Sequence, residues 1–314
     1  MSRPDERYVY GPVPSRRLGR SLGVDLVPYK TCSYDCVYCQ LGRTTRKTLR
    51  RREYVAPERI FADLERRLAS APAFDYIGLA GSGEPTLNSA LGRIIRGVKE
   101  RTDKPVAVLT NGSLLWDPEV RDDLSDADVV MPSLDAGDAR LFRYVNRPHP
   151  KLKFEKVVDG LAEFRSGFAK PIWLEVFLLG GVTGIGPEAE KIASACRRIR
   201  PDKVQLNTVA RPPAEDFAFP VEPGLLASFA ELFDPPAEVI AEPVRGLDPA
   251  ADAVPDEEIL EFLRRRPSTA PGISSGLGLH IGEAVKRLDA LAARGEIRST
   301  VRGGERFYEI ARPG

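Results

Sequence analysis

Between residues 22 and 208, short runs of β-branched and other apolar residues alternate with longer stretches whose apolar positions recur every three to four residues. The first pattern is typical of buried strands and the second of amphipathic helices. Strands are predicted at 23–27, 76–81, 106–112, 129–135, 172–180 and 203–209. Helices are predicted at 57–70, 88–101, 117–125, 187–199, and 138–166 with a break around Pro148 and Pro150. Six strands in strict alternation with helices predict an α/β fold with a parallel sheet, specifically a partial (β/α)6 barrel.

After Val209 the pattern gives way to proline-rich segments with one short helix predicted at 224–233. Such composition is typical of a wrapping segment followed by a linker. We therefore expect three parts, a barrel over 1–235, a proline-rich linker over 236–254 and a small C-terminal domain over 255–314.

The C-terminal part has its own periodic pattern. It predicts a helix at 256–265, a Gly/Ser-rich turn, a second helix near 280–294, and two alternating strands joined at Gly303-Gly304. That order of elements is typical of a winged helix-turn-helix domain. Because its own hydrophobic face, the proline-rich linker and the hairpin indicate a separately folding unit, we expect none of its residues to reach the cysteine cluster.

Composition adds the expected class of protein. The 314 residues are 42% hydrophobic and 29% charged, and 46 basic side chains against 45 acidic ones leave a net charge of +1. A charge so close to neutral gives the whole molecule no strong field toward nucleic acids or anionic membranes. The N-terminus has no apolar leader, and no stretch reaches the roughly 18 apolar residues of a membrane span. We expect a cytoplasmic protein without a membrane partner.

Three of the four cysteines fall within eight positions. Cys32, Cys36 and Cys39 follow the first predicted strand at CxxxCxxC spacing, where a loop can curl three thiolates around one centre. A closed [4Fe–4S] site needs four cysteines, so three leave one iron open to a cofactor or substrate. S-adenosylmethionine (SAM) suits that open position through its amino nitrogen and carboxylate.

A structural zinc site is the alternative for these cysteines. Its fourth ligand would be Cys196, His149 or His280, and each lies more than 100 residues away in sequence. Cys196 shares one face of its predicted helix with apolar residues, so it is predicted to be a core cysteine.

The segment TCSYDCVYCQLG resembles the radical SAM superfamily, whose CxxxCxxC motif often has an aromatic residue before the last cysteine, here Tyr38. The resemblance extends over roughly residues 10–210, and GPVPSRRLGRSLGVD and CVYCQLGRTT resemble the branch of Fe–S oxidoreductases related to wybutosine-synthesis enzymes. It implies a radical SAM enzyme with one [4Fe–4S] cluster and SAM, which it cleaves reductively to a 5′-deoxyadenosyl radical that takes hydrogen from a substrate. It also implies a one-electron reductant such as flavodoxin or ferredoxin.

Polar residues at the ends of the predicted strands are candidates for SAM contact. Gly83 and Glu84 resemble the superfamily's glycine–glutamate motif, in which the carboxylate receives the SAM amino group. Asn111 ends the third strand, and the resemblance places Ser133 against the SAM ribose or carboxylate, with Asp135 as its neighbour. Small polar residues at such positions also commonly cap the next helix.

The last two strands carry further candidates. Glu175 interrupts an apolar strand and Asn207 alternates with apolar residues on the next one. A carboxylate is costly to bury unpaired, so we expect Glu175 to face the barrel lumen, in contact with SAM or substrate, together with Asn207.

The substrate stays open between RNA, a peptide or protein side chain, and a small metabolite. Six basic residues over 43–52 are typical of a solvated face, or else guide a phosphate-bearing substrate. The C-terminal part has ten basic and nine acidic residues over 256–314, which is not the excess typical of a DNA-binding domain. The alternative function is nevertheless an Fe–S-containing DNA-binding redox regulator that uses the winged helix.

Overall fold

The computed structural model describes residues 8–71, 73–210, 213–240, 254–279, 281–302 and 305–311. Its central sheet contains parallel strands in the order β2 (Gly19–Asp25), β5 (Tyr76–Ala80), β6 (Val106–Thr110), β7 (Val129–Pro132), β8 (Trp173–Phe177) and β9 (Lys203–Asn207). Isolated parallel bridges, Val130 to Ile172 and Ser133 to Glu175, join β7 to β8. The α/β fold with a partial barrel is thereby confirmed, with the strands in the predicted sequence.

Further short strands extend this sheet and the loop beside it. β1 (Val9–Ser15) pairs antiparallel with β2, with an irregularity between Tyr10 and Val13. β10 (Glu238–Val239) pairs with β9 inside the segment predicted as linker, and β3 (Thr31–Cys32) pairs with β4 (Arg46–Lys47). The sequence pattern missed β1 because its Gly and two Pro residues break the alternation typical of a strand.

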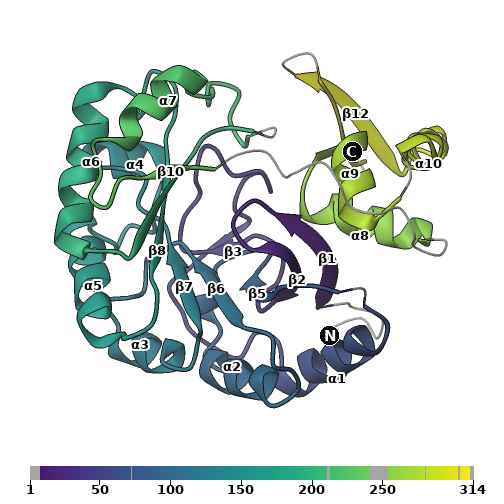
Figure 1. Ribbon diagram of the computed structural model, residues 1–314, viewed down its shortest axis with the longest axis horizontal. Helices are drawn as coiled ribbons and strands as arrows, with labels where there is room; N and C mark the ends of the chain where they lie inside the picture. The colour runs from purple at the N-terminus through teal and green to yellow at the C-terminus, as the bar shows by residue number, and fades with distance from the viewer. Residues whose placement is uncertain are drawn as a thin grey trace.

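Helices cover the outer face of the strands, as Figure 1 shows. They are α1 (Pro57–Ser70), α2 (Leu91–Lys99), α3 (Pro118–Leu124), α4 (Ala139–Val145), α5 (Phe154–Gly167), α6 (Gly186–Ile199) and α7 (Pro223–Ala230), with a 3-10 turn η1 (Pro85–Leu87). The break predicted within 138–166 separates α4 from α5. Proline in the first turn of α1, α3 and α6 suits helix starts, where its missing N–H costs nothing.

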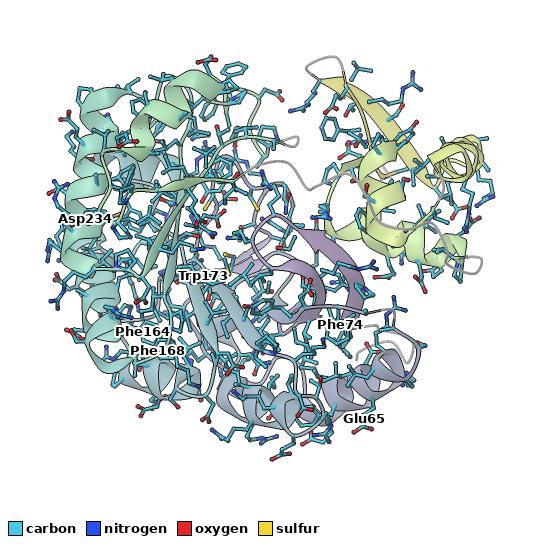
Figure 2. The ribbon with its side chains drawn as sticks, in the orientation of Figure 1. Glu65, Phe74, Phe164, Phe168, Trp173 and Asp234 are labelled. Carbon is cyan, nitrogen blue, oxygen red and sulfur yellow. The ribbon has the colours of Figure 1, made fainter. Side chains whose placement is uncertain are left out.

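The alternation of side chains along the strands separates the core from the lumen. On β8, Leu174 and Val176 are fully buried, whereas Trp173, Glu175 and Phe177 between them are half-buried. Successive side chains on a strand point to opposite faces, so the apolar set packs under the helices and Glu175 lies on the other face. Figure 2 shows side chains filling the layer between helices and strands, including Phe164 and Phe168, which stack at 4.8 Å.

The C-terminal part forms a unit with its own hydrophobic core. Its elements are α8 (Asp256–Arg265), β11 (Ser268–Thr269), α9 (Ala270–Leu277), α10 (Ile281–Ala293), β12 (Ile297–Arg302) and β13 (Glu305–Ile310). β13 pairs antiparallel with both β12 and β11. The antiparallel pair β12–β13 follows the helices as predicted, while the turn at Gly303-Gly304 lies outside the described residues. The predicted Gly/Ser-rich turn is wrong, because that segment forms helix α9. The assignment as a winged helix stays a prediction.

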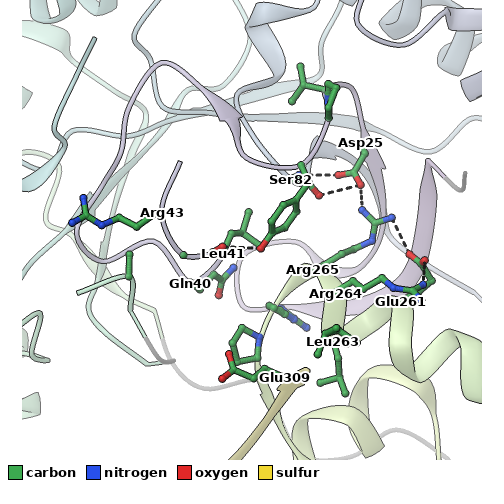
Figure 3. A pocket seen from close by; sticks show the side chains of 18 of the residues that line it. Asp25, Gln40, Leu41, Arg43, Ser82, Glu261, Leu263, Arg264, Arg265 and Glu309 are labelled. Carbon is green, nitrogen blue, oxygen red and sulfur yellow. Dashed lines mark hydrogen bonds and ion pairs between the residues drawn. The ribbon is translucent and has the colours of Figure 1, made fainter. Parts of the chain in front are cut away.

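An ion pair links this unit to the barrel. Arg265, at the end of α8, pairs with Asp25 at the end of β2, and its guanidinium lies 3.7 Å from the ring centroid of Tyr10. Asp25 also accepts hydrogen bonds from the backbone and hydroxyl of Ser82. Figure 3 shows this contact, with both charged side chains largely removed from solvent. The C-terminal unit is therefore docked on the β1–β2 edge of the barrel.

We expect Arg265→Ala to destabilise the protein by about 3 kcal/mol, because it leaves a buried carboxylate without its cation. The adjacent Arg264 is a matched control, since it is exposed and, among the described residues, its ion pairs are with Glu257 and Glu261 of its own helix. Its alanine variant should change stability by less than about 0.5 kcal/mol. Melting temperatures measured by circular dichroism check this, and equal melting of the two variants would contradict the docking role of Arg265.

Candidate active site

The cysteine-bearing loop leaves the end of β2 and is fixed on two sides. The carbonyl of Thr31 accepts the backbone N–H of Glu84, at the end of β5. On the other side, the N–H groups of Asp35 and Val37 donate to the carbonyls of Asn146 and Val145, at the end of α4. Gly83 permits the first contact, because a Cβ atom there would collide with the Thr31 carbonyl. The loop is thereby held across the ends of the strands.

Each of the three sulfurs in this loop lies within reach of a side-chain N–H donor. The Lys30 ammonium lies 3.1 Å from the Cys39 sulfur, the Asn111 amide lies 3.5 Å from the Cys32 sulfur, and the Asn146 amide lies 3.5 Å from the Cys36 sulfur. Donors to sulfur stabilise the negative charge of thiolates and of a cluster bound to them. The three donors come from different segments, so the surrounding fold is arranged around the sulfurs.

Burial disfavours negative charge on the cysteines themselves. It raises the pKa of the Cys32 thiol to about 12, with the charge of Glu84 adding to the effect. Burial, followed by the charge of Asp135, also raises the pKa of Cys36 well above its ordinary value. A bound metal centre would compensate this cost, and thiols release their protons when they bind metal.

Within the described part of the chain, no three His, Cys, Asp or Glu side chains converge closely enough to hold one metal ion. In a [4Fe–4S] cluster each cysteine binds a different iron, so the sulfurs surround the cluster instead of converging on one atom. Cys196 is fully buried in the hydrophobic core, as predicted, and His280 lies outside the described residues. Three cysteines on one loop, each with a donor, fit a cluster.

Glu84 lies beneath the loop and is only 2% exposed. Its Oε1 accepts from the Thr86 backbone at 3.1 Å and from the hydroxyls of Thr86 and Thr110 at 2.5 and 2.6 Å. Its Oε2 accepts the Asn111 backbone N–H at 2.8 Å. Burial raises the pKa of this carboxyl, while the hydrogen bonds from Thr110 and Thr86 oppose the rise. Glu84 therefore ties the end of β5 to the end of β6.

Asp135 organises the opposite side of the loop. Its Oδ2 accepts the Tyr38 hydroxyl at 2.5 Å and the Asn146 amide at 2.7 Å, and its Oδ1 accepts the Phe177 backbone N–H at 3.1 Å. The Tyr38 ring stacks on Phe177 with centroids 4.0 Å apart. Burial raises the pKa of Asp135 to about 6, against the effect of the hydrogen bonds from Tyr38 and Asn146. One carboxylate thus positions both the aromatic residue of the motif and the donor to Cys36.

A cavity of about 380 Å³ opens beside Tyr38 and Cys39. Ser133, Glu175 and Asn207 line it, so the lumen-facing position expected for Glu175 is what the structure shows. Glu175 pairs with Arg17 at 2.7 Å and accepts the Asn207 amide at 2.9 Å. The cavity is therefore lined by polar and apolar side chains together, bordered by one sulfur, and located at the carboxyl ends of the strands, where barrel enzymes bind their ligands.

The chain matches the family model "Radical SAM superfamily" over residues 26–189. The chain belongs to the radical SAM superfamily. The [4Fe–4S] cluster and SAM are accordingly its cofactors, and the fold, loop and cavity described above are those of a radical SAM protein. Membership of the wybutosine-related branch stays a prediction.

Among curated relatives, UPF0026 protein MJ1312 of Methanocaldococcus jannaschii is 38% identical over 72% of this chain and 70% of its own length. A protein named GTPase Obg from Brachyspira hyodysenteriae is 36% identical over 97% of this chain, which spans only 45% of that relative. Among solved structures, a radical SAM methyltransferase from Sphaerobacter thermophilus aligns with a TM-score of 0.54 at 20% identity, covering 76% of this chain and 67% of that one. This last similarity supports the fold alone.

One feature of the structure was not anticipated from the sequence. Phe262, Arg265 and Arg266 of the C-terminal part line the same cavity as Cys39. Docking through Asp25 turns the end of α8 toward the strand ends, and sequence distance gives no sign of it.

The described helices include none that is long and apolar enough to cross a membrane.

Sequence reasoning also missed the donors Lys30 and Asn146. Lys30 stands two residues before the first cysteine and is only 3% exposed, unusual burial for a lysine. A cation so close to the motif was the available signal. Asn146 lies 107 positions after Cys39 in the sequence, so only the return of α4 to the loop reveals its role.

We expect Lys30→Met to lower the reduction potential of the cluster, because a nearby cation stabilises the reduced, more negative state more than the oxidised one. The control is Lys104→Met, which removes an exposed lysine away from the cysteine loop. A redox titration followed by electron paramagnetic resonance, at matched iron content, measures both. A midpoint equal to that of the unmodified protein would contradict the electrostatic role of Lys30.

Proposed function

We propose that this protein is a radical SAM enzyme in which Cys32, Cys36 and Cys39 hold the cluster and the adjoining cavity of about 380 Å³ binds SAM. When bound, the cluster supplies an electron that splits SAM into methionine and a 5′-deoxyadenosyl radical, which then abstracts hydrogen from a substrate. The observation that supports this best is the set of three sulfurs from one loop, each with an N–H donor, one of which, that of Cys39, borders the cavity.

The residues around the cavity divide by position. Ser133 and the Glu175–Asn207 pair line its wall, and we assign them to contacts with SAM or substrate. Tyr38 and Asp135 hydrogen-bond to each other and orient the cysteine loop. We therefore place them beside SAM as residues that shape the cavity. Asn111 donates to Cys32 and to Ser33, which assigns it to the cluster as well as to the SAM side. Gly83 and Glu84 are not among the residues that line this cavity. We keep Glu84, with Gly83 before it, as the partner of the SAM amino group because the motif resembles that of the superfamily.

The electron requires a donor, and we propose a small one-electron carrier such as a flavodoxin or ferredoxin. Cys39 lines the cavity, whereas Cys32 and Cys36 are not among its lining residues. We also propose that the reaction is of the oxidoreductase type and that the protein is related to the wybutosine branch. We place it in the reducing cytoplasm.

The decisive experiment is to reduce anaerobically prepared protein with dithionite in the presence of SAM and to measure 5′-deoxyadenosine and methionine by mass spectrometry. We expect both products in equal amounts. A DNA-binding redox regulator, the alternative function, would bind iron and release neither, so absence of both products from cluster-loaded protein would overturn the proposal.

We expect Cys36→Ala to lose most of its iron, from about four per chain, and all 5′-deoxyadenosine formation, because it removes one of three ligands. The matched control is Cys196→Ala, which removes the fourth cysteine, fully buried in the core and away from the cavity. That variant should keep iron and activity. Iron and sulfide assays on both check the assignment, and full iron content in Cys36→Ala would contradict it.

We expect Glu84→Gln to keep the cluster and weaken SAM binding by roughly tenfold to a hundredfold, the value of a charge-assisted hydrogen bond. Glutamine preserves the shape of the side chain among Thr86, Thr110 and Asn111 while removing its charge. Glu188→Gln is the control, because Glu188 on α6 is also buried but pairs with Arg140 of α4 and Lys191 of α6. Equilibrium binding of SAM checks both, and unchanged affinity in Glu84→Gln would remove Glu84 from the SAM site.

A further inference from the structure

A second and larger cavity, of about 980 Å³, lies between the barrel and the C-terminal unit. Figure 3 shows side chains from both parts converging on it. Its size is at the upper end of the range for small-molecule sites. The two cavities adjoin, because they share the lining residues Gln40, Leu41, Arg265 and Arg266. A molecule bound between the two parts would therefore stand next to the SAM cavity.

The wall of this larger cavity is strongly basic for a protein whose net charge is +1. Seven arginines line it against four carboxylates, those of Asp25, Asp216, Glu261 and Glu309. Most of the arginines are neutralised by ion pairs: Arg298 pairs with Glu309 at 2.9 Å, and Arg302 reaches Asp216 at 3.5 Å. The excess of cations must therefore come from the arginines outside these pairs.

Two arginines of the wall, Arg52 and Arg266, form no ion pair with any described carboxylate. Their guanidinium groups lie over aromatic rings, Arg52 at 4.4 Å from the Tyr54 centroid and Arg266 at 4.8 Å from the Phe262 centroid. Arg52 is exposed at the barrel side, whereas Arg266 is half-buried and borders both cavities. A ring holds a guanidinium in place and leaves its N–H donors available to an anion.

Arg266 also stands near a second cation. Burial, followed by the influence of neighbouring Arg16, lowers its pKa, with Tyr10 acting in the opposite direction. A half-buried guanidinium that no described carboxylate neutralises is stabilised when an anion joins it. A phosphate carries up to two negative charges and three acceptor oxygens, so one phosphate can serve two guanidinium groups where a carboxylate neutralises one.

We propose that the cavity between the barrel and the C-terminal unit binds a phosphate group of the substrate, with Arg266 at its inner end and Arg52 on its barrel side. The substrate class is accordingly a phosphate ester. The placement of the reacting carbon beside SAM rests on the function proposed above, whereas phosphate binding itself does not. The C-terminal unit then contributes directly to substrate binding through Arg266.

The test is calorimetric titration of full-length protein, without SAM or reductant, with pyrophosphate and with a short 5′-phosphorylated single-stranded RNA. We expect Arg266→Gln and Arg52→Gln each to weaken binding of at least one probe by about tenfold, the loss of one charge-assisted contact. Arg198→Gln is the control, because Arg198 is exposed on α6 and pairs with Asp159 outside the cavity. It should bind as the unmodified protein does.

The salt dependence of binding distinguishes a nucleic acid from a small compound with a single phosphate group. A nucleic acid bound at several phosphates loses affinity steeply as salt rises, whereas a single phosphate group gives a shallow dependence. Arg266→Lys should bind with intermediate affinity, because lysine retains the charge without the two-pronged donor geometry. Arg52 is exposed, so its variant tests the site even if Arg266→Gln folds poorly.

Affinities for both probes that are unchanged in Arg52→Gln and Arg266→Gln would overturn the proposal, as would failure of the unmodified protein to bind either probe. Loss of SAM affinity in Arg266→Gln, with phosphate affinity retained, would also overturn it by assigning Arg266 to the SAM site. Failure of SAM cleavage, in contrast, would count against the proposed function and leave these binding results standing.

Discussion

The site depends on the cost of holding polar sulfur and carboxylate groups in an apolar setting. Glu84 and Asp135 are buried, and Cys32 and Cys36 half-buried, at the carboxyl ends of the strands. Each needs a hydrogen-bond donor there, because an unpaired buried polar group costs several kcal/mol. The donors are distributed over the ends of β6 and α4 and over the cysteine loop itself. The site can therefore form only when these separate elements have folded correctly against one another.

Asn146 shows how closely the formation of the site depends on the fold. Its amide donates both to the Cys36 sulfur and to Asp135, which in turn holds the hydroxyl of Tyr38. A side chain that serves two acceptors cannot move toward one without weakening the other. Tyr38, stacked on Phe177 at the end of β8, completes a rigid connection between the cysteine loop and the cavity wall. The geometry beside the cysteines is thus set by residues more than 90 positions apart.

Much of this arrangement could be predicted from the sequence, for reasons specific to each part. The periodicity of apolar residues located the six parallel strands and most helices, because burial of one face makes apolar positions recur at a regular spacing in the sequence. The cysteine spacing identified the loop because its three ligands are close in sequence. Lys30 and Asn146 escaped prediction because one polar side chain near a motif, or far from it, gives no periodic signal. The position of Arg266 escaped because docking between two parts is decided by surface complementarity, here the Arg265–Asp25 pair, which no local pattern encodes.

That docking has a consequence for how the protein can diversify. The cysteine loop, with its donors Lys30, Asn111 and Asn146, belongs wholly to the barrel, whereas one wall of the outer cavity belongs to a unit with a separate core. Exchange of that unit for another, docked at the same β1–β2 edge, would give the barrel a new outer wall while its cysteine environment stayed as it is. Radical generation and choice of target molecule can in this way change independently, the first under tight geometric constraint and the second by substitution of a detachable surface.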